Sequence, residues 1–121
     1  MAFCAYYYIF LKEKLMKRES KFQRDLIDAI ESIFPGCMVL KNDPNYIQGI
    51  PDLLVLYENK WAALEVKRSA NEHRQPNQEY YISKMNNMSY ASFVYPENME
   101  DVLYELQQAL RPGRATRVPK R

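Results

Sequence analysis

The sequence predicts an α/β domain in which helices flank both faces of a mixed β-sheet. Three observations support this prediction. Two short apolar runs, residues 53–57 and 61–66, are separated by a polar turn and are typical of a β-hairpin. Residues 61–95 then read as strand, helix and strand, which is long enough for a parallel crossover. Amphipathic stretches before and after these strands supply further helices for the two faces.

The composition indicates one folded domain. The 121 residues are 47% hydrophobic and 13% aromatic, which excludes disorder for most of the chain. Two cysteines and one histidine give neither a disulfide framework nor a zinc site, and a reducing compartment is expected. No apolar run approaches the ~20 residues of a membrane span, so no membrane partner is expected.

The charge distribution says more about partners than the formal net charge of +2. Basic residues gather in residues 12–24 and in a tail, residues 111–121, that contains no acid. Basic ends around a near-neutral middle suit a polyanionic partner, although solvated basic tails are also common.

An apolar stripe at helical spacing predicts the first helix, which Pro35-Gly36 ends. Its members are Leu15, Phe22, Leu26, Ile30 and Ile33. Glu19 interrupts this stripe, one turn after Leu15 and one turn before Phe22. A carboxylate on the core-facing side of a helix costs free energy unless it is paired, so Glu19 is a candidate site residue. The alternative is an acid at the helix start beside a capping Ser20, where the helix dipole favours it.

The remaining elements follow from periodicity and turn residues. A short strand is expected over residues 37–40, and a polar, turn-rich segment follows it over residues 41–45. A helix is expected over residues 76–88, a strand over 90–95 and a helix over 99–110. The residues expected on the inner face of the helix over 76–88 are Gln78, Tyr81, Ile82, Met85 and Met88.

Three charged residues are expected to meet at the open end of the hairpin. Folding the chain about Asn59 brings Asp52 opposite residue 65, 66 or 67. Glu65 and Lys67 lie two apart on one strand and project to the same face. Two carboxylates with an ammonium beside them predict a site for a hard cation such as Mg²⁺. The alternatives are ordinary turn chemistry at Asp52 and a weak, solvated ion pair between Glu65 and Lys67.

The residues of this hairpin resemble a known signature. Gly49-Ile50-Pro51-Asp52, twelve further residues and then Glu65-Val66-Lys67 are similar to the PD-(D/E)xK nuclease motif. The element order over roughly residues 18–110 resembles the restriction-endonuclease-like core of that superfamily, αβββαβ plus a C-terminal helix. The Gly-Ile-Pro-Asp form and the downstream Gln78 resemble the VRR-NUC group and small phage-type Holliday junction resolvases. The nuclease domain is therefore expected over residues 16–110, between an N-terminal extension, residues 1–15, and the basic tail.

The resemblance also implies roles for these residues. Asp52 and Glu65 would hold one or two Mg²⁺ or Mn²⁺ ions, with the backbone carbonyl of Val66 as a further ligand. Lys67 would assist the attacking water. Gln78 would position its neighbours, and Glu19 matches the acid that many members carry on the first helix. Glu19 could then bind the metal through a water or position it without direct contact. The implied reaction is hydrolysis of a DNA phosphodiester that leaves a 5′-phosphate.

Basic residues around such a site would offset repulsion between its carboxylates and the DNA backbone. The candidates are Lys17, Arg18, Lys21, Lys41, Arg68 and Arg74. For any single one of them, a solubilising surface charge is the alternative.

Branched DNA is the expected substrate, and a homodimer is the expected assembly, because a twofold dimer supplies the two symmetric incisions that a four-way junction needs. The expected compartment is the cytoplasm, that of a bacterial host if the chain is phage-encoded. Two alternatives stay open: a nicking or restriction-like nuclease that acts on duplex DNA, and a DNA-binding module that does not cut.

Overall fold

The computed structural model describes residues 21–111, and the chain there follows the predicted order of elements. A helix runs through residues 21–33. It is followed by β1 (Met38–Lys41), β2 (Leu53–Tyr57), β3 (Lys60–Val66), α2 (Pro76–Met88) and β4 (Tyr90–Val94). A short 3₁₀ helix, η1 (Pro96–Asn98), then leads into α3 (Met99–Leu110). The only element of this order that the sequence did not predict is η1.

The four strands form one mixed sheet in the order β1-β2-β3-β4. The first three strands are antiparallel neighbours, whereas β3 and β4 are parallel and α2 connects them. A two-residue turn joins β2 to β3, with Glu58 at a φ of 56°. Leu53 pairs with Leu64, so the register places Asp52 opposite Glu65. The structure thus selects one of the three pairings that the sequence allowed.

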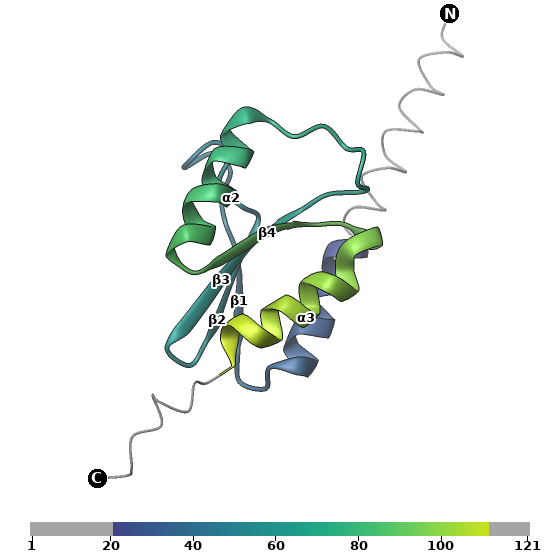
Figure 1. Cartoon of the computed structure of the whole chain (residues 1–121), viewed down its shortest axis with the longest axis vertical. Helices are drawn as coiled ribbons and strands as arrows, with labels where there is room; N and C mark the ends of the chain where they lie inside the picture. The colour runs from purple at the N-terminus through teal and green to yellow at the C-terminus, as the bar shows by residue number, and fades with distance from the viewer. Residues whose placement is uncertain (1–20, 112–121) are drawn as a thin grey trace, which may run out of the picture.

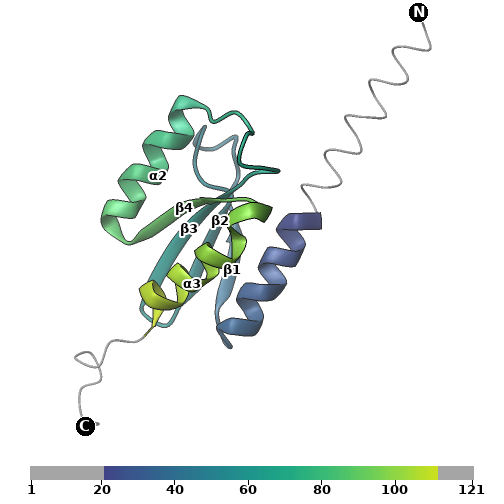
Figure 2. The same ribbon diagram turned by 45° about the vertical axis from the view of Figure 1, so that its right-hand side comes forward.

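Helices cover both faces of the sheet, as the sequence predicts (Figure 1). The helix α2 packs over β3 and β4 on one face, while α3 and the helix through residues 21–33 lie on the other face (Figure 2). The main core fills the space between that helix pair and the sheet. Its buried members are Leu26, Ile30, Phe34, Leu53, Val55, Ala62, Leu64, Val66, Val94, Val102, Leu106 and Leu110. The observed architecture is therefore a mixed α/β fold with a flanked four-stranded sheet.

The central strand β3 is buried on both faces, which is why two charged groups end up inside the protein. Successive residues of a strand point to opposite faces. Leu64 and Val66 pack into the core beneath α3, so Glu65 points to the face that α2 covers. The sequence therefore places a carboxylate on the α2 side of the sheet at the point where β3 ends.

The fit of α2 to the sheet differs from the prediction at one end. Gln78, Tyr81, Ile82 and Met85 are half-buried, as expected for an inner face. Met88 is 66% exposed, so its predicted inward position is wrong. Met88 is the last residue of α2. A helical period identifies which face is apolar, but it cannot tell where the supporting sheet ends.

The edge strand β1 leaves apolar side chains uncovered. Val39 packs against the core, so its neighbours Met38 and Leu40 project to the opposite face. Both side chains are exposed, because α2 covers β3 and β4 instead of this edge. Among the helices of residues 21–111, none has the length and apolar character needed to cross a membrane.

Candidate functional site

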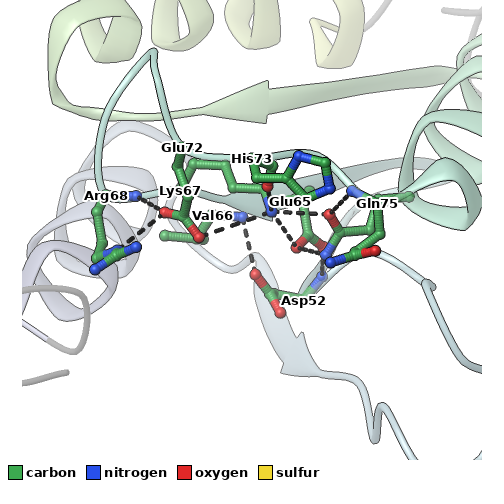
Figure 3. A network of polar contacts seen from close by, with 9 residues as sticks. Asp52, Glu65, Val66, Lys67, Arg68, Glu72, His73 and Gln75 are labelled. Atoms are coloured by element: carbon green, nitrogen blue, oxygen red, sulfur yellow. Dashed lines mark hydrogen bonds and ion pairs between the residues drawn. The ribbon is translucent and has the colours of Figure 1, made fainter. Parts of the chain in front are cut away.

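A network of polar groups occupies the end of the sheet where β2 begins and β3 ends, beside the first turn of α2 (Figure 3). It brings together five side chains from four segments of the chain. They are Asp52 before β2, Glu65 and Lys67 at the end of β3, Glu72 in the connecting loop and Gln78 in α2. Four of these five are residues that the sequence singled out.

Two hydrogen bonds join Asp52 to the end of β3, one with Glu65 and one with Val66. The backbone N–H of Asp52 donates to Glu65 Oε1 at 3.2 Å, and the N–H of Val66 donates to Asp52 Oδ2 at 2.9 Å. In an extended strand the N–H and C=O of one residue lie on the same edge. The carbonyl of Val66 is therefore turned toward Asp52, whereas the N–H of Lys67 donates to Val94 on the other edge. Asp52 and Glu65 thus lie side by side at this end of the sheet, with the Val66 carbonyl on the same strand edge.

Lys67 is buried inside this network instead of extending into solvent. Glu65 and Lys67 are each only 4% exposed. The ammonium Nζ of Lys67 donates to Gln78 Oε1 at 2.8 Å and to the His73 carbonyl at 3.2 Å. It also lies 4.0 Å from Glu65 Oε2 and 3.8 Å from Glu72 Oε2. This burial contradicts the alternative of a solvated strand end with a weak surface ion pair.

Gln78 connects the two strand residues to α2. Its Nε2 donates to Glu65 Oε2 at 2.9 Å, and its Oε1 accepts from Lys67 Nζ and from the backbone N–H of Gln75 at 3.0 Å. Gln75 is the N-cap of α2, so the start of the helix fixes the amide of Gln78. A side chain held at three points positions both Glu65 and Lys67.

The loop before β2 aims Asp52 into the site. Asn42 closes this loop through two hydrogen bonds of 2.8 Å, one from its backbone N–H to the Asp52 carbonyl and one from its Nδ2 to the Pro51 carbonyl. Gly49 lies directly against the first turn of α2 at a φ of +90°. A Cβ on Gly49 would be 2.4 Å from Asn77 Cβ and 3.2 Å from the Gln78 nitrogen. The glycine of the Gly-Ile-Pro-Asp motif thus permits a close approach of loop and helix.

Gly49→Ala is therefore expected to lower the free energy of unfolding by about 2–5 kcal/mol, the sum of an unfavourable positive φ and overpacking. The matched control is Gly36→Ala. Gly36 has almost the same φ, +89°, but a Cβ there would meet nothing within 4 Å. Gly36→Ala should lower the free energy of unfolding only by the cost of the positive φ, about 1–2 kcal/mol. Urea denaturation of both variants measures the difference, and equal losses would show that the contact with α2 is unimportant.

Burial perturbs the ionisation of Asp52. Desolvation raises the pKa of this carboxyl above its ordinary value, and the nearby charge of Glu72 acts in the same direction. The hydrogen bond from Val66 and the charge of Lys67 partly offset the rise in the pKa. A cation bound beside Asp52 would favour the charged form of this carboxyl and so lower its raised pKa.

The same pKa shift predicts a pH-dependent gain in stability for Asp52→Asn. The folded state holds the Asp52 proton more tightly than the unfolded chain does, so the contribution of Asp52 to stability falls as pH rises through the interval between the unfolded and folded pKa. Asparagine mimics the neutral acid and keeps an oxygen for the Val66 N–H. Urea denaturation should show a larger gain for the variant at pH 7 than at pH 4. A larger gain at pH 4 would contradict the raised pKa.

The basic candidates are distributed unevenly around the site. Lys41 is exposed at the end of β1 and pairs through its backbone with Leu53, next to Asp52. Arg68 and Arg74 flank the loop after β3: Arg68 Nε lies 3.3 Å from Glu72 Oε1, and the Arg74 guanidinium stacks 4.0 Å over the Phe93 ring.

Lys21 lies on the helix that covers the opposite face of the sheet, where its Nζ contacts Asp25 at 3.0 Å. Three other sequence candidates, Lys17, Arg18 and Glu19, lie outside the described residues.

Glu72 is the site residue that sequence reasoning missed. It lies in the polar loop of residues 69–75, where a solvated acid is the ordinary expectation. A weak signal was present, because Glu72 follows Arg68 by four residues and Lys67 by five. Only the course of the loop brings its carboxylate back to the end of β3.

The oxygen atoms at this site suit a hard divalent cation. Within residues 21–111 no three His, Cys, Asp or Glu side chains gather closely enough to form a metal site by themselves. Asp52, Glu65 and the Val66 carbonyl form a small oxygen set of the kind that Mg²⁺ uses, with water and substrate oxygens completing the shell. Comparison of the chain with protein-family models, with curated proteins and with solved structures found no match.

Proposed function

We propose that this protein is a metal-dependent endonuclease that hydrolyses phosphodiester bonds in branched DNA. The observation that carries the proposal is the convergence of Asp52 and Glu65 with a buried Lys67 at one end of the sheet. Asp52, Glu65 and the Val66 carbonyl would hold Mg²⁺ or Mn²⁺. The ion would polarise a phosphoryl oxygen and lower the pKa of a bound water.

The side chains of the site have distinct roles in this proposal. Lys67 stabilises the negative charge that develops on the phosphoryl group as water attacks phosphorus. Gln78 keeps Glu65 and Lys67 oriented, because its amide contacts both of them. The attack breaks the bond between phosphorus and the 3′ oxygen and leaves a 5′-phosphate and a 3′-hydroxyl.

Phosphate contacts would come from basic side chains near the site. Arg68 is the described candidate whose exposed side chain directly follows Lys67, whereas Lys41 pairs with Leu53 and shares the face of Val39, opposite to that of Glu65. Contacts to phosphate position the DNA backbone without reading the base sequence. They therefore favour selection of DNA by its shape.

A homodimer belongs to this proposal because a four-way junction needs two symmetric cuts. The exposed apolar side chains of Met38 and Leu40 on the edge strand β1 offer a surface that a second copy of the chain could cover. Light scattering that returns a monomer under conditions in which junctions are cut would overturn this part of the proposal.

A cleavage panel tests the proposed function. The purified protein is incubated with Mg²⁺ and a four-way junction, a flap or a linear duplex at one salt concentration, because phosphate contacts make binding salt-dependent. The proposal expects the branched substrates to be cut faster than the duplex. Equal rates on all three would favour the nicking or restriction-like alternative, and binding without any cleavage would favour the non-cutting DNA-binding module.

A further inference from the structure

We propose that Glu72 is a positioning residue that holds the ammonium of Lys67 in place between Glu65 and Gln78. This inference rests on the proposed function, because it assigns Glu72 a part in the same reaction. Glu72 would not touch the DNA or a metal ion. It would act through Lys67, whose ammonium stabilises the charge on the phosphoryl group in the proposed function.

The two carboxylate oxygens of Glu72 have separate partners. Oε1 accepts from the backbone N–H of Arg68 at 2.6 Å and lies 3.3 Å from Arg68 Nε. Oε2 lies 3.8 Å from Lys67 Nζ (Figure 3). Arg68 thus anchors one oxygen, and the other is directed at the ammonium. This division of contacts is what a positioning carboxylate requires.

The local chain geometry fixes Glu72 independently of the helices. Its backbone N–H donates to the Ser69 carbonyl at 3.2 Å, so the loop turns back immediately after β3. The side chain is only 19% exposed, and the side chain of Lys67 is 6% exposed. The ion pair between them is therefore largely shielded from solvent, where a charge partner has more effect than at the surface.

Among the partners of Lys67, Glu72 is the carboxylate that the proposed function does not also use to bind the metal. Gln78 and the His73 carbonyl accept hydrogen bonds from Lys67 but carry no charge. Glu65 is a second carboxylate partner of Lys67, yet in the proposed function its oxygens also serve as metal ligands. Glu72 is then the carboxylate that remains available to the ammonium while Asp52 and Glu65 hold the cation.

Glu72→Gln separates positioning from a purely structural role. The glutamine keeps an oxygen for the Arg68 N–H but removes the charge that faces Lys67. Loss of a residue that orients a site typically costs about tenfold to a hundredfold in activity. We expect a loss of that size in the single-turnover cleavage rate at saturating four-way junction, with junction affinity in Ca²⁺ unchanged. The matched control is Glu79→Gln, which neutralises an exposed acid in the first turn of α2 and should leave both quantities unchanged.

A second readout does not depend on cleavage. Acetylation of lysines by acetic anhydride, followed by mass spectrometry, measures how tightly the Lys67 ammonium is held. Acetylation of Lys67 should be faster in Glu72→Gln than in the wild type, while that of the exposed Lys84 should not change. Glu72→Asp keeps the charge and should restore part of the cleavage rate.

The possible outcomes distinguish this inference from the proposed function. If the wild type cuts DNA and Glu72→Gln cuts at the same rate, the positioning role is overturned and the nuclease function stands. If the wild type cuts no DNA, the proposed function fails, and acetylation still tests the contact: an unchanged rate at Lys67 would overturn it. A cleavage loss accompanied by weaker junction binding would also overturn it, because positioning of Lys67 should not alter affinity.

Discussion

Asp52→Asn is expected to reduce the rate of four-way junction cleavage in Mg²⁺ by at least about a hundredfold, the order of loss that follows removal of one group that stabilises transition-state charge. The substitution removes the charge that would hold the cation but keeps the shape and the acceptor for the Val66 N–H. Single-turnover kinetics measure the rate. Junction affinity measured in Ca²⁺ should not fall, because one source of repulsion toward phosphate is gone.

The matched control for this prediction is Asp101→Asn. Asp101 is an exposed acid in the first turn of α3, which covers the opposite face of the sheet from α2. Its neutralisation should leave the cleavage rate unchanged. A rate for Asp52→Asn equal to that of the wild type would remove Asp52 from the site and with it the basis of the proposed function.

Lys67→Met is expected to lower the free energy of unfolding by about 3–5 kcal/mol, the cost of leaving a buried charge without its partner. Glu65 would keep its carboxylate in the interior, and the oxygen of Gln78 would lose a donor. Urea denaturation gives the free energy. The control Lys84→Met, at an exposed position of α2, should change it by no more than about 0.5 kcal/mol.

The double variant Glu65→Gln with Lys67→Met tests the reason for that loss. Replacing both members of a buried ion pair is much less costly than removing one, so the double variant should be more stable than Lys67→Met alone. A double variant that loses the sum of both single effects would show that the two charges do not interact. The expected loss of stability also limits cleavage assays of Lys67 variants. Their cleavage rates must be measured under conditions in which the variant remains folded.

The pairing at the hairpin could be predicted largely from the sequence. The apolar runs on both sides of Glu58-Asn59 limited Asp52 to three partners, and the two-residue turn observed in the structure selects Glu65. The order of the elements followed from helical and strand periodicity in the same way. These features are local, and each is encoded within a few residues of where it acts.

The burial of the site could not be predicted in this way. Glu65 and Lys67 are buried because α2 crosses over the end of β3 and places Gln78 against both. That contact depends on the path of the loop between β3 and α2, which no periodic pattern describes. The same loop carries Glu72 to Lys67, and for this reason the sequence did not identify it.

Gly49 illustrates an intermediate case. The sequence identified it as part of a motif, but the motif gives no physical reason for a glycine. The reason is the close approach of Gly49 to Asn77 and Gln78 at the start of α2. Such a contact joins two segments nearly 30 residues apart, and only the fold brings them together.

The metal site is tested most directly by calorimetric titration of Mn²⁺ into the wild type and Asp52→Asn. The convergence of Asp52, Glu65 and the Val66 carbonyl predicts saturable binding of one or two ions to each wild-type chain, weakened by more than about tenfold in the variant, since an outright ligand is lost. The absence of saturable binding to the wild type, or equal affinity in both proteins, would contradict a divalent-cation site at the end of this sheet.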